Sequence, residues 1–201
     1  MKTCCKVAAA VAVICGACFM LGCAGGERKE LAKSTKISIK MVTSESVHGI
    51  MAPDDKNVWV CGNHGMIYHG VDNGTDWIWE AQDSGFKELL IDGTFINTQK
   101  GWIAGLLGTV LHTTDGGKTW VKQDEESDKI LNDIRFIDKD NGWVVGELGI
   151  ILNTTDGGKT WNTIMPEFFE RKTIEEEFEN PRPALFGIAA TDKNNVWLCG
   201  I

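Results

Sequence analysis

Short apolar runs rich in Trp, Val and Ile alternate along the chain with stretches rich in Gly, Asn and Asp. β-Branched and aromatic residues favour strands, whereas Gly, Asn and Asp favour tight turns, so the pattern predicts many short strands. The segment Gly-Trp-Ile-Ala-Gly at 101–105 returns 41 residues later as Gly-Trp-Val-Val-Gly at 142–146. Related segments occur at 58–62 and at 196–200. The sequence therefore predicts an all-β protein built from four repeated units.

Each complete unit contains a strand, a polar turn, a Trp-containing strand, a Gly-led strand, and a hairpin that leads into a fourth strand. The polar turn carries Asp or Asn five residues before the Trp, where the side chain can bond nearby backbone N–H groups and reverse the chain. These turn residues are Asp54, Asn97, Asp138 and Asp192. Four short strands in about 41 residues is the size of a β-propeller blade.

We expect about three and a half blades. The repeats are predicted at about 41–84, 85–126, 127–166 and 184–201, so that a partial β-propeller covers 41–201 and an acidic insertion occupies 167–183. Propellers remove exposed sheet edges by closing into a ring, whereas the fourth unit stops after its second strand. We therefore expect the natural reading frame to continue beyond Ile201.

The N-terminal 22 residues have the pattern of an export signal. Lys2 and Lys6 precede an apolar run that is too short to span a membrane comfortably as a helix. The run ends in Met20-Leu21-Gly22-Cys23, which resembles the bacterial lipoprotein signal, in which the cysteine is lipidated and becomes the new N-terminus. The predicted order is a signal peptide at 1–22, a lipidated Cys23, and a polar tether over 23–40.

Two alternatives to this export signal stay open. Cys18 is a competing lipidation site, and the apolar run could remain as an uncleaved N-terminal membrane helix. In each case the body of the protein is expected outside the cytoplasm, anchored to a membrane.

Charge and cysteine content narrow the function classes. The chain has 20 basic and 28 acidic residues, and loss of Lys2 and Lys6 with the signal would leave a net charge near −10. Nucleic acid is disfavoured as a partner, because phosphate binding requires a basic surface. After cleavage only Cys23, Cys61 and Cys199 would remain, which is not a disulfide framework. Cys61 and Cys199 occupy a strand position held by Ala104 and Val145 elsewhere, so both are interpreted as small core residues.

The most specific motif is Thr-Thr-Asp-Gly-Gly-Lys-Thr-Trp at 113–120, which is repeated unchanged at 154–161. It matches the Asp box of bacterial neuraminidase (BNR) repeats, and 72–77 is a degenerate copy. The predicted structural residues are Asp72, Gly74 and Trp77 in the degenerate copy, Thr113, Asp115, Gly117, Thr119 and Trp120 in the next, and Thr154, Asp156, Gly158, Thr160 and Trp161 in the last.

The spacing of the Asp box fits a structural role. An Asp carboxylate can accept backbone N–H bonds across a tight turn, Gly supplies positive φ, and the Trp that follows can cover the hairpin. Turn-forming Asp is more common than catalytic or calcium-binding Asp in such a setting. We therefore interpret the boxes as staples, with no catalytic residue and no metal among them.

The Gly-Trp-x-x-Gly strand followed by Gly-x-x-Leu-x-Thr-Thr-Asp-Gly-Gly-Lys-Thr-Trp resembles the photosystem II stability/assembly factor family, within the sialidase-like propeller superfamily. The resemblance covers about residues 47–201. It implies a seven-bladed propeller that acts as an assembly or binding factor beside a membrane, of which this chain would be a fragment.

An extracytoplasmic sialidase-like glycoside hydrolase is the alternative, because such enzymes also carry Asp boxes. That chemistry requires grouped arginines, a Tyr nucleophile and an acid. Here Arg135, Arg171 and Arg182 match no such motif, and Tyr68 takes a repeat position that is Leu in other units, so the catalytic residues would have to lie in missing blades.

His69 and His112 occupy equivalent positions in successive units, but no third ligand completes a metal site. No cofactor motif is present. The prediction is a noncatalytic propeller scaffold that binds a protein or cell-envelope partner.

Overall fold

The structure is a computed structural model that describes residues 45–123, 128–167 and 181–201. The predicted signal peptide, Cys23, the tether at 23–40, and residues 168–180 of the acidic insertion at 167–183 lie outside these residues.

The described chain forms antiparallel sheets in which consecutive strands are neighbours. The first sheet contains β1 (Val47–Met51), β2 (Asn57–Gly62), β3 (Ile67–Asp72) and β4 (Trp77–Gln82). The second contains β5 (Leu90–Phe95), β6 (Gly101–Gly105), β7 (Val110–Thr113) and β8 (Val121–Gln123). The third contains β9 (Leu131–Phe136), β10 (Gly142–Gly146), β11 (Ile151–Thr154) and β12 (Asn162–Thr163), and the last pairs β13 (Leu185–Asp192) with β14 (Asn195–Gly200). Short 3₁₀ turns η1 (Asn63–Gly65) and η2 (Glu147–Gly149) join the second and third strands of the first and third sheets. The predicted all-β fold with four-stranded units is confirmed.

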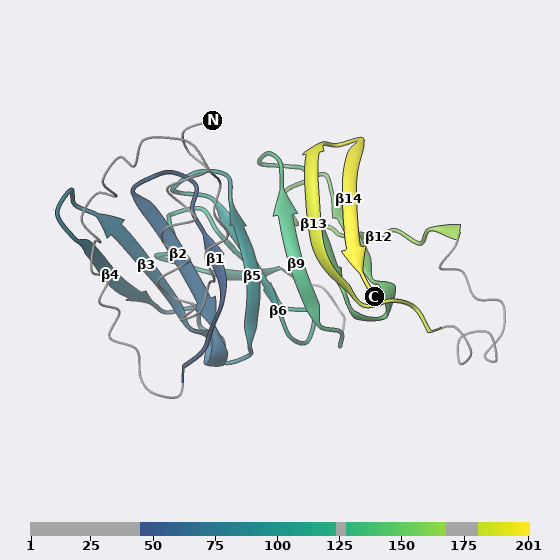
Figure 1. Cartoon of the computed structure of the whole chain (residues 1–201), viewed down its shortest axis with the longest axis horizontal. Coiled ribbons are helices and arrows are strands. Elements are labelled where there is room, and N and C mark those ends of the chain that lie inside the picture. Colours follow the sequence, from purple (N-terminus) through teal and green to yellow (C-terminus); the bar gives the residue numbers. More distant parts are fainter. Residues whose placement is uncertain (1–44, 124–127, 168–180) are drawn as a thin grey trace, which may run out of the picture.

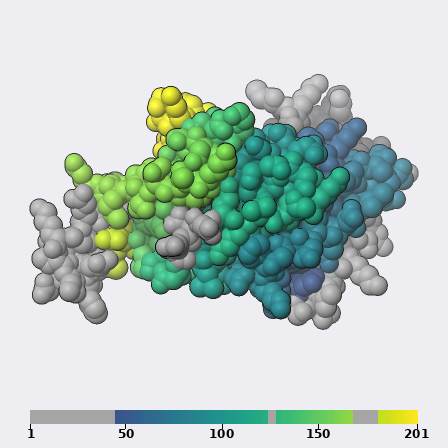
Figure 2. Space-filling view, turned by 180° about the vertical axis from the view of Figure 1, so that it is seen from behind, coloured from purple at the N-terminus to yellow at the C-terminus, as the bar shows by residue number. Residues whose placement is uncertain are grey.

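The first strand of each sheet packs against the first strand of the next: β1 against β5, β5 against β9, and β9 against β13. Figure 1 shows these four strands in sequence, with β2, β3 and β4 on the far side of β1 from β5. Seen from behind in Figure 2, the second and third sheets follow the first across the molecule. Face-to-face stacking of four-stranded meanders is the arrangement of consecutive propeller blades. We call β1, β5, β9 and β13 the inner strands.

Aromatic side chains fill the joints between blades. In the first joint Trp59 of β2 stacks on Phe95 of β5, with ring centroids 4.1 Å apart, and Phe95 and Trp120 form a T-shaped pair. The same positions in the second joint are held by Trp102, Phe136 and Trp161. Trp59 and Trp102 are completely buried, because each lies between two sheets. The hydrophobic core is therefore divided into layers, one at each joint.

The four polar turns between the first and second strands have the predicted geometry. In each, one side-chain oxygen of Asp or Asn accepts hydrogen bonds from the backbone N–H groups two and three residues later, at 2.7–3.1 Å. The prediction for Asp54, Asn97, Asp138 and Asp192 is confirmed. These turns fix where each inner strand ends.

The two described cysteines are free, but they differ in burial. Cys61 is completely buried in the first joint, as its repeat position predicts. The prediction for Cys199 is wrong, because its side chain is exposed. It lies on β14 of the last described sheet and is not part of the core that this sheet forms with the third blade.

Replacement of Phe136 by Ala should destabilise the fold by about 3–5 kcal/mol, because the ring is buried between Trp102 and Trp161 and its loss leaves a cavity. Urea unfolding followed by Trp fluorescence measures this change. Val121→Ala, which truncates an exposed side chain on β8, is the control and should change the free energy of unfolding little. Equal effects of the two substitutions would contradict the layered core.

Candidate functional site

The Asp box at 113–120 closes the hairpin between β7 and β8 through its carboxylate. Asp115 Oδ1 accepts hydrogen bonds from the Thr119 N–H at 2.9 Å and from the Thr113 hydroxyl at 2.8 Å, and Oδ2 accepts the Thr119 hydroxyl at 2.7 Å. Thr113 Oγ1 in turn accepts the Gly117 N–H at 2.8 Å. Gly116 and Gly117 have φ values of 76° and 84°, which favour Gly. Both carboxylate oxygens are therefore used inside the hairpin.

The box at 154–161 repeats this geometry. Asp156 accepts the Thr160 N–H and the hydroxyls of Thr154 and Thr160. Hydrogen bonds from Thr160, with the Thr154 hydroxyl, lower the pKa of Asp156 to about 2, and the bonds from Thr119 and Thr113 do the same for Asp115. A carboxyl with this pKa carries no proton to donate near neutral pH. The boxes hold hairpins and are unsuited to acid catalysis.

The degenerate copy at 72–77 does not form this box. Asp72 Oδ1 accepts only the Gly74 N–H, whereas Asn73 Oδ1 accepts the N–H groups of Thr75 and Asp76. β3 and β4 stay paired up to Asp72 and Trp77, which makes an ordinary tight hairpin.

The strand register also corrects which Trp of this hairpin matches the Asp-box Trp. Glu80 pairs with His69 as Val121 pairs with His112, so Trp79 holds the position of Trp120. The prediction placed Trp77 there, two residues early. The threonines whose hydroxyls bond Asp115 are also missing, because Gly70 and Ile78 stand at the positions of Thr113 and Thr119.

Each complete box also contacts the preceding blade. Gln82 Nε2 at the end of β4 donates to the Gly116 carbonyl at 2.8 Å, and Gln123 Nε2 donates to the Gly157 carbonyl at 2.9 Å. A Cβ on Gly117 would lie 2.0 Å from Gln82 Oε1, so a side chain at this position would displace the glutamine. Sequence reasoning missed these two glutamines, although they recur 41 residues apart at the end of the fourth strand.

The paired histidines do not meet. His69 stacks on Trp59 and His112 stacks on Trp102, each within its own blade. Burial lowers the pKa of His112 to about 4, with Lys100 adding to the shift, so the ring is neutral. Within residues 45–123, 128–167 and 181–201, no three His, Cys, Asp or Glu side chains are grouped to hold a metal ion.

The turns between the second and third strands contain non-glycine residues with positive φ. His64, Leu107 and Leu148 occupy equivalent positions in three blades and have φ of 58°, 55° and 54°. This left-handed conformation costs a non-glycine residue about 1–2 kcal/mol. The side chains of Leu107 and Leu148 are 55% and 51% exposed.

These turns share one side of the blades. In an antiparallel meander, the turn after the second strand lies at the same end as the connection to the next blade, and the Asp box lies at the opposite end. The backbone confirms this, because Gly65, Gly108 and Gly149 donate to the carbonyls of Glu88, Lys129 and Pro183, which precede the next inner strands. We call this side, with His64, Leu107 and Leu148, the turn face.

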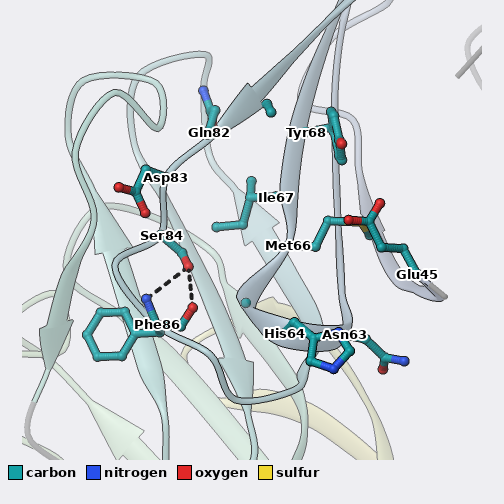
Figure 3. A pocket seen from close by; sticks show the side chains of 12 residues that line it. Glu45, Asn63, His64, Met66, Ile67, Tyr68, Gln82, Asp83, Ser84 and Phe86 are labelled. Atoms are coloured by element: carbon teal, nitrogen blue, oxygen red, sulfur yellow. Dashed lines mark hydrogen bonds between the residues drawn. The ribbon is translucent and has the colours of Figure 1, made fainter. Parts of the chain in front are cut away.

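A shallow pocket of about 230 Å³ opens at the turn face of the first blade (Figure 3). His64, Met66 and Tyr68 line it from the turn and β3, and Ser84 and Phe86 line it from the connection after β4. Ser84 Oγ bonds both the N–H and the carbonyl of Phe86, which holds that connection in place.

The predicted packing role of Tyr68 needs correction. Leu111 and Leu152 at the same position are buried, whereas Tyr68 is half-buried at the pocket. Tyr68 and Arg135 belong to the first and third sheets, with the second sheet between them, so they do not form the grouped site of a sialidase.

Replacement of Asp115 by Ala should lower the free energy of unfolding by about 1–2 kcal/mol, because three hydrogen bonds are lost. Asp72→Ala, which removes one bond, is the matched control and should have a smaller effect. Urea unfolding at pH 7 distinguishes them. Because the pKa of Asp115 is depressed, its contribution is present above about pH 4 and lost as the pH falls toward 2. Equal losses in both variants would contradict the staple.

Known proteins support the fold. The family model described as Photosynthesis system II assembly factor YCF48 matches residues 78–168, somewhat less than half of the chain. The structure of YCF48 bound to a D1 peptide is similar at 23% sequence identity and a TM-score of 0.55, covering 64% of this chain and 43% of that one. YCF48 from Cyanidioschyzon merolae is similar at 18% identity and a TM-score of 0.54, covering 74% and 48%. The chain thus spans less than half the length of either structure.

No curated protein matches the sequence. No helix among the described residues is long and apolar enough to cross a membrane. The family match, the stacked four-stranded sheets and the structural neighbours agree with one another, and this chain therefore contains a BNR-type β-propeller that resembles the photosystem II assembly factor YCF48.

Proposed function

We propose that this chain is a noncatalytic scaffold outside the cytoplasm that binds a protein segment, or another cell-envelope partner, through its turn face. The observation that carries the proposal is the pair of exposed leucines in left-handed turns, Leu107 and Leu148. The peptide-bound state of YCF48 gives independent support for a protein partner.

Neither leucine contributes to folding in an obvious way. Gly or Asn would adopt the left-handed conformation at lower cost, and an exposed apolar side chain gains little from burial within the chain. Strained backbone positions concentrate at binding sites, where contacts with a partner can offset the strain. Leu107 and Leu148 lie on neighbouring blades, so one partner segment could contact both.

The pocket extends this surface across the first blade. His64, the counterpart of the two leucines, lines it together with Met66, Tyr68 and Phe86. Polar and acidic side chains, among them Glu45, Asn63 and Asp83, complete the lining, so the hollow offers a partner side chain both apolar contact and hydrogen-bonding groups. A partner strand that crosses the turn face would therefore find two exposed leucines and one pocket along its path.

A test replaces both leucines by Asn, which tolerates positive φ. Leu107→Asn/Leu148→Asn should keep or raise the free energy of unfolding, because strain is relieved, while it weakens peptide binding about tenfold through lost apolar contact. Fluorescence polarisation with a labelled D1 peptide, of the kind bound to YCF48, measures the affinity. Ile78→Asn/Val121→Asn, at exposed apolar positions on β4 and β8, is the control.

Undiminished binding by the leucine variant would contradict the turn face as the binding surface. Absence of D1-peptide binding by the unmodified protein would contradict a YCF48-like ligand. Site-specific photocrosslinking from position 148 in cells would then test the broader proposal of a cell-envelope partner, and an absence of crosslinked protein would contradict that too.

The anchor belongs to the same proposal. Cys23→Ser should move the protein from the membrane fraction to the soluble fraction and abolish incorporation of labelled fatty acid, because the acceptor thiol is lost. Cys18→Ser is the matched control and should leave both readouts unchanged. Release by Cys18→Ser instead would reassign the lipidation site, and membrane retention by both variants would favour an uncleaved N-terminal helix.

A further inference from the structure

A buried and a half-buried carboxyl group face each other across the joint between the second and third blades. Asp92 of β5 and Asp133 of β9 occupy the same repeat position, opposite Ala104 and Val145 in their respective sheets. Gly49 and Gly187 stand at this position in the first and last inner strands, so the acidic pair belongs to this joint alone among the described blades. Asp133 is 7% exposed.

The two oxygens of Asp133 have different surroundings. Oδ2 accepts the N–H of Ile188 in β13 at 2.7 Å, which ties the third blade to the next. Oδ1 is buried and receives no hydrogen bond. A buried acceptor without a donor destabilises a fold by about 1–3 kcal/mol, and more when it is charged. The neighbouring side chain within hydrogen-bonding reach is the Asp92 carboxyl.

A carboxylate cannot donate a hydrogen bond, but a protonated carboxyl can. If Asp92 carries a proton, its O–H supplies the donor that Asp133 Oδ1 lacks, and two negative charges no longer face each other in a buried site. A single proton on Asp92 thus supplies the missing donor and removes the repulsion between two carboxylates.

The surroundings of Asp92 favour its protonated form. Burial, the Asp133 charge and the hydrogen bond to Asp133 together raise the pKa of Asp92 to about 7. The Gly93 N–H and Arg135 oppose this rise without cancelling it. On the other side, β2 presents the Cys61 thiol, whose pKa is raised by burial and by Asp92, so it is uncharged.

We propose that Asp92 and Asp133 hold one proton between them, and that this shared proton fastens the second blade to the third. The joint is then a pH-sensitive element of the propeller. Unfolding exposes Asp92 to water, where its pKa returns to near 3.8. Because the folded-state value is higher, the contribution to stability is complete below about pH 4 and lost as the pH rises through about 7. The stacking of these blades is therefore tightest in mild acid.

The experiment compares thermal unfolding between pH 5 and pH 8.5 for the unmodified chain, Asp92→Asn and Asp55→Asn. The unmodified chain should lose melting temperature as the pH rises. Asp92→Asn should melt higher at pH 8 and lose this dependence on pH, because its amide donates to Asp133 at every pH. Asp55→Asn alters an exposed carboxyl in the turn after β1 and should retain the slope of the unmodified chain.

A second measurement uses only the unmodified chain, so it does not depend on whether a variant folds. Infrared difference spectra of the unmodified chain, recorded on titration from pH 5 to pH 8.5, should show the carbonyl stretch of a protonated carboxyl disappear near neutral pH. Absence of that band at pH 5.5 would overturn the proposal. Retention of the full pH slope by a folded Asp92→Asn variant would do so as well.

Discussion

The constraint on which this structure depends is that its four-stranded antiparallel sheets bury their apolar faces against one another, because the described residues form strands and short turns without a helix that could cover a sheet. In the first two joints, one blade contributes a buried Trp from its second strand, and the next blade contributes a Phe from its inner strand that stacks on it. A single blade would leave both rings in water. In the third joint Ala190 stands at the Phe position and packs in the core with Trp143. Most of the stability therefore comes from packing between neighbouring blades. The hydrogen-bonded turns fix the strand ends and so align each sheet with the next.

The Asp box has two roles, one inside its hairpin and one between blades. Inside its hairpin, the carboxylate and the hydroxyls satisfy backbone groups that a seven-residue loop would otherwise leave to water. Across the joint, the same hairpin presents the Gly116 or Gly157 carbonyl to a glutamine of the preceding blade, and Gly157 also accepts the indole N–H of Trp102. The box thus couples local hairpin geometry to blade stacking. The first blade, which has an ordinary hairpin, lacks this device.

The two ends of the blades therefore differ in which side chains are free to contact a partner. At the Asp-box end, the carboxylates of the boxes and of the polar turns are occupied by hydrogen bonds within their own loops. At the turn face, exposed leucines stand in left-handed turns on the second and third blades, and the first blade carries a pocket. A scaffold whose structural chemistry is concentrated at one end can vary the other end to suit a partner. The carboxyl pair of the second joint lies apart from both ends and acts on how the blades hold together.

The sequence by itself determined the all-β class, the repeated unit, the polar turns and the two complete Asp boxes. The first two depend on the pattern of residue types along the chain, and the turns and boxes depend on hydrogen bonds between residues close in sequence. Only the tertiary structure decided the rest. The pairing of β3 with β4 shows that Trp79, and not Trp77, holds the Asp-box Trp position in the first blade, because these strands stay paired for longer than the strands of a complete box. The tertiary structure also shows that Cys199 is exposed, that Tyr68 lines a pocket, and that Asp92 lies next to Asp133. Each of these outcomes depends on which sheet lies against which face, and a repeat pattern is the same whether or not a neighbouring face is covered.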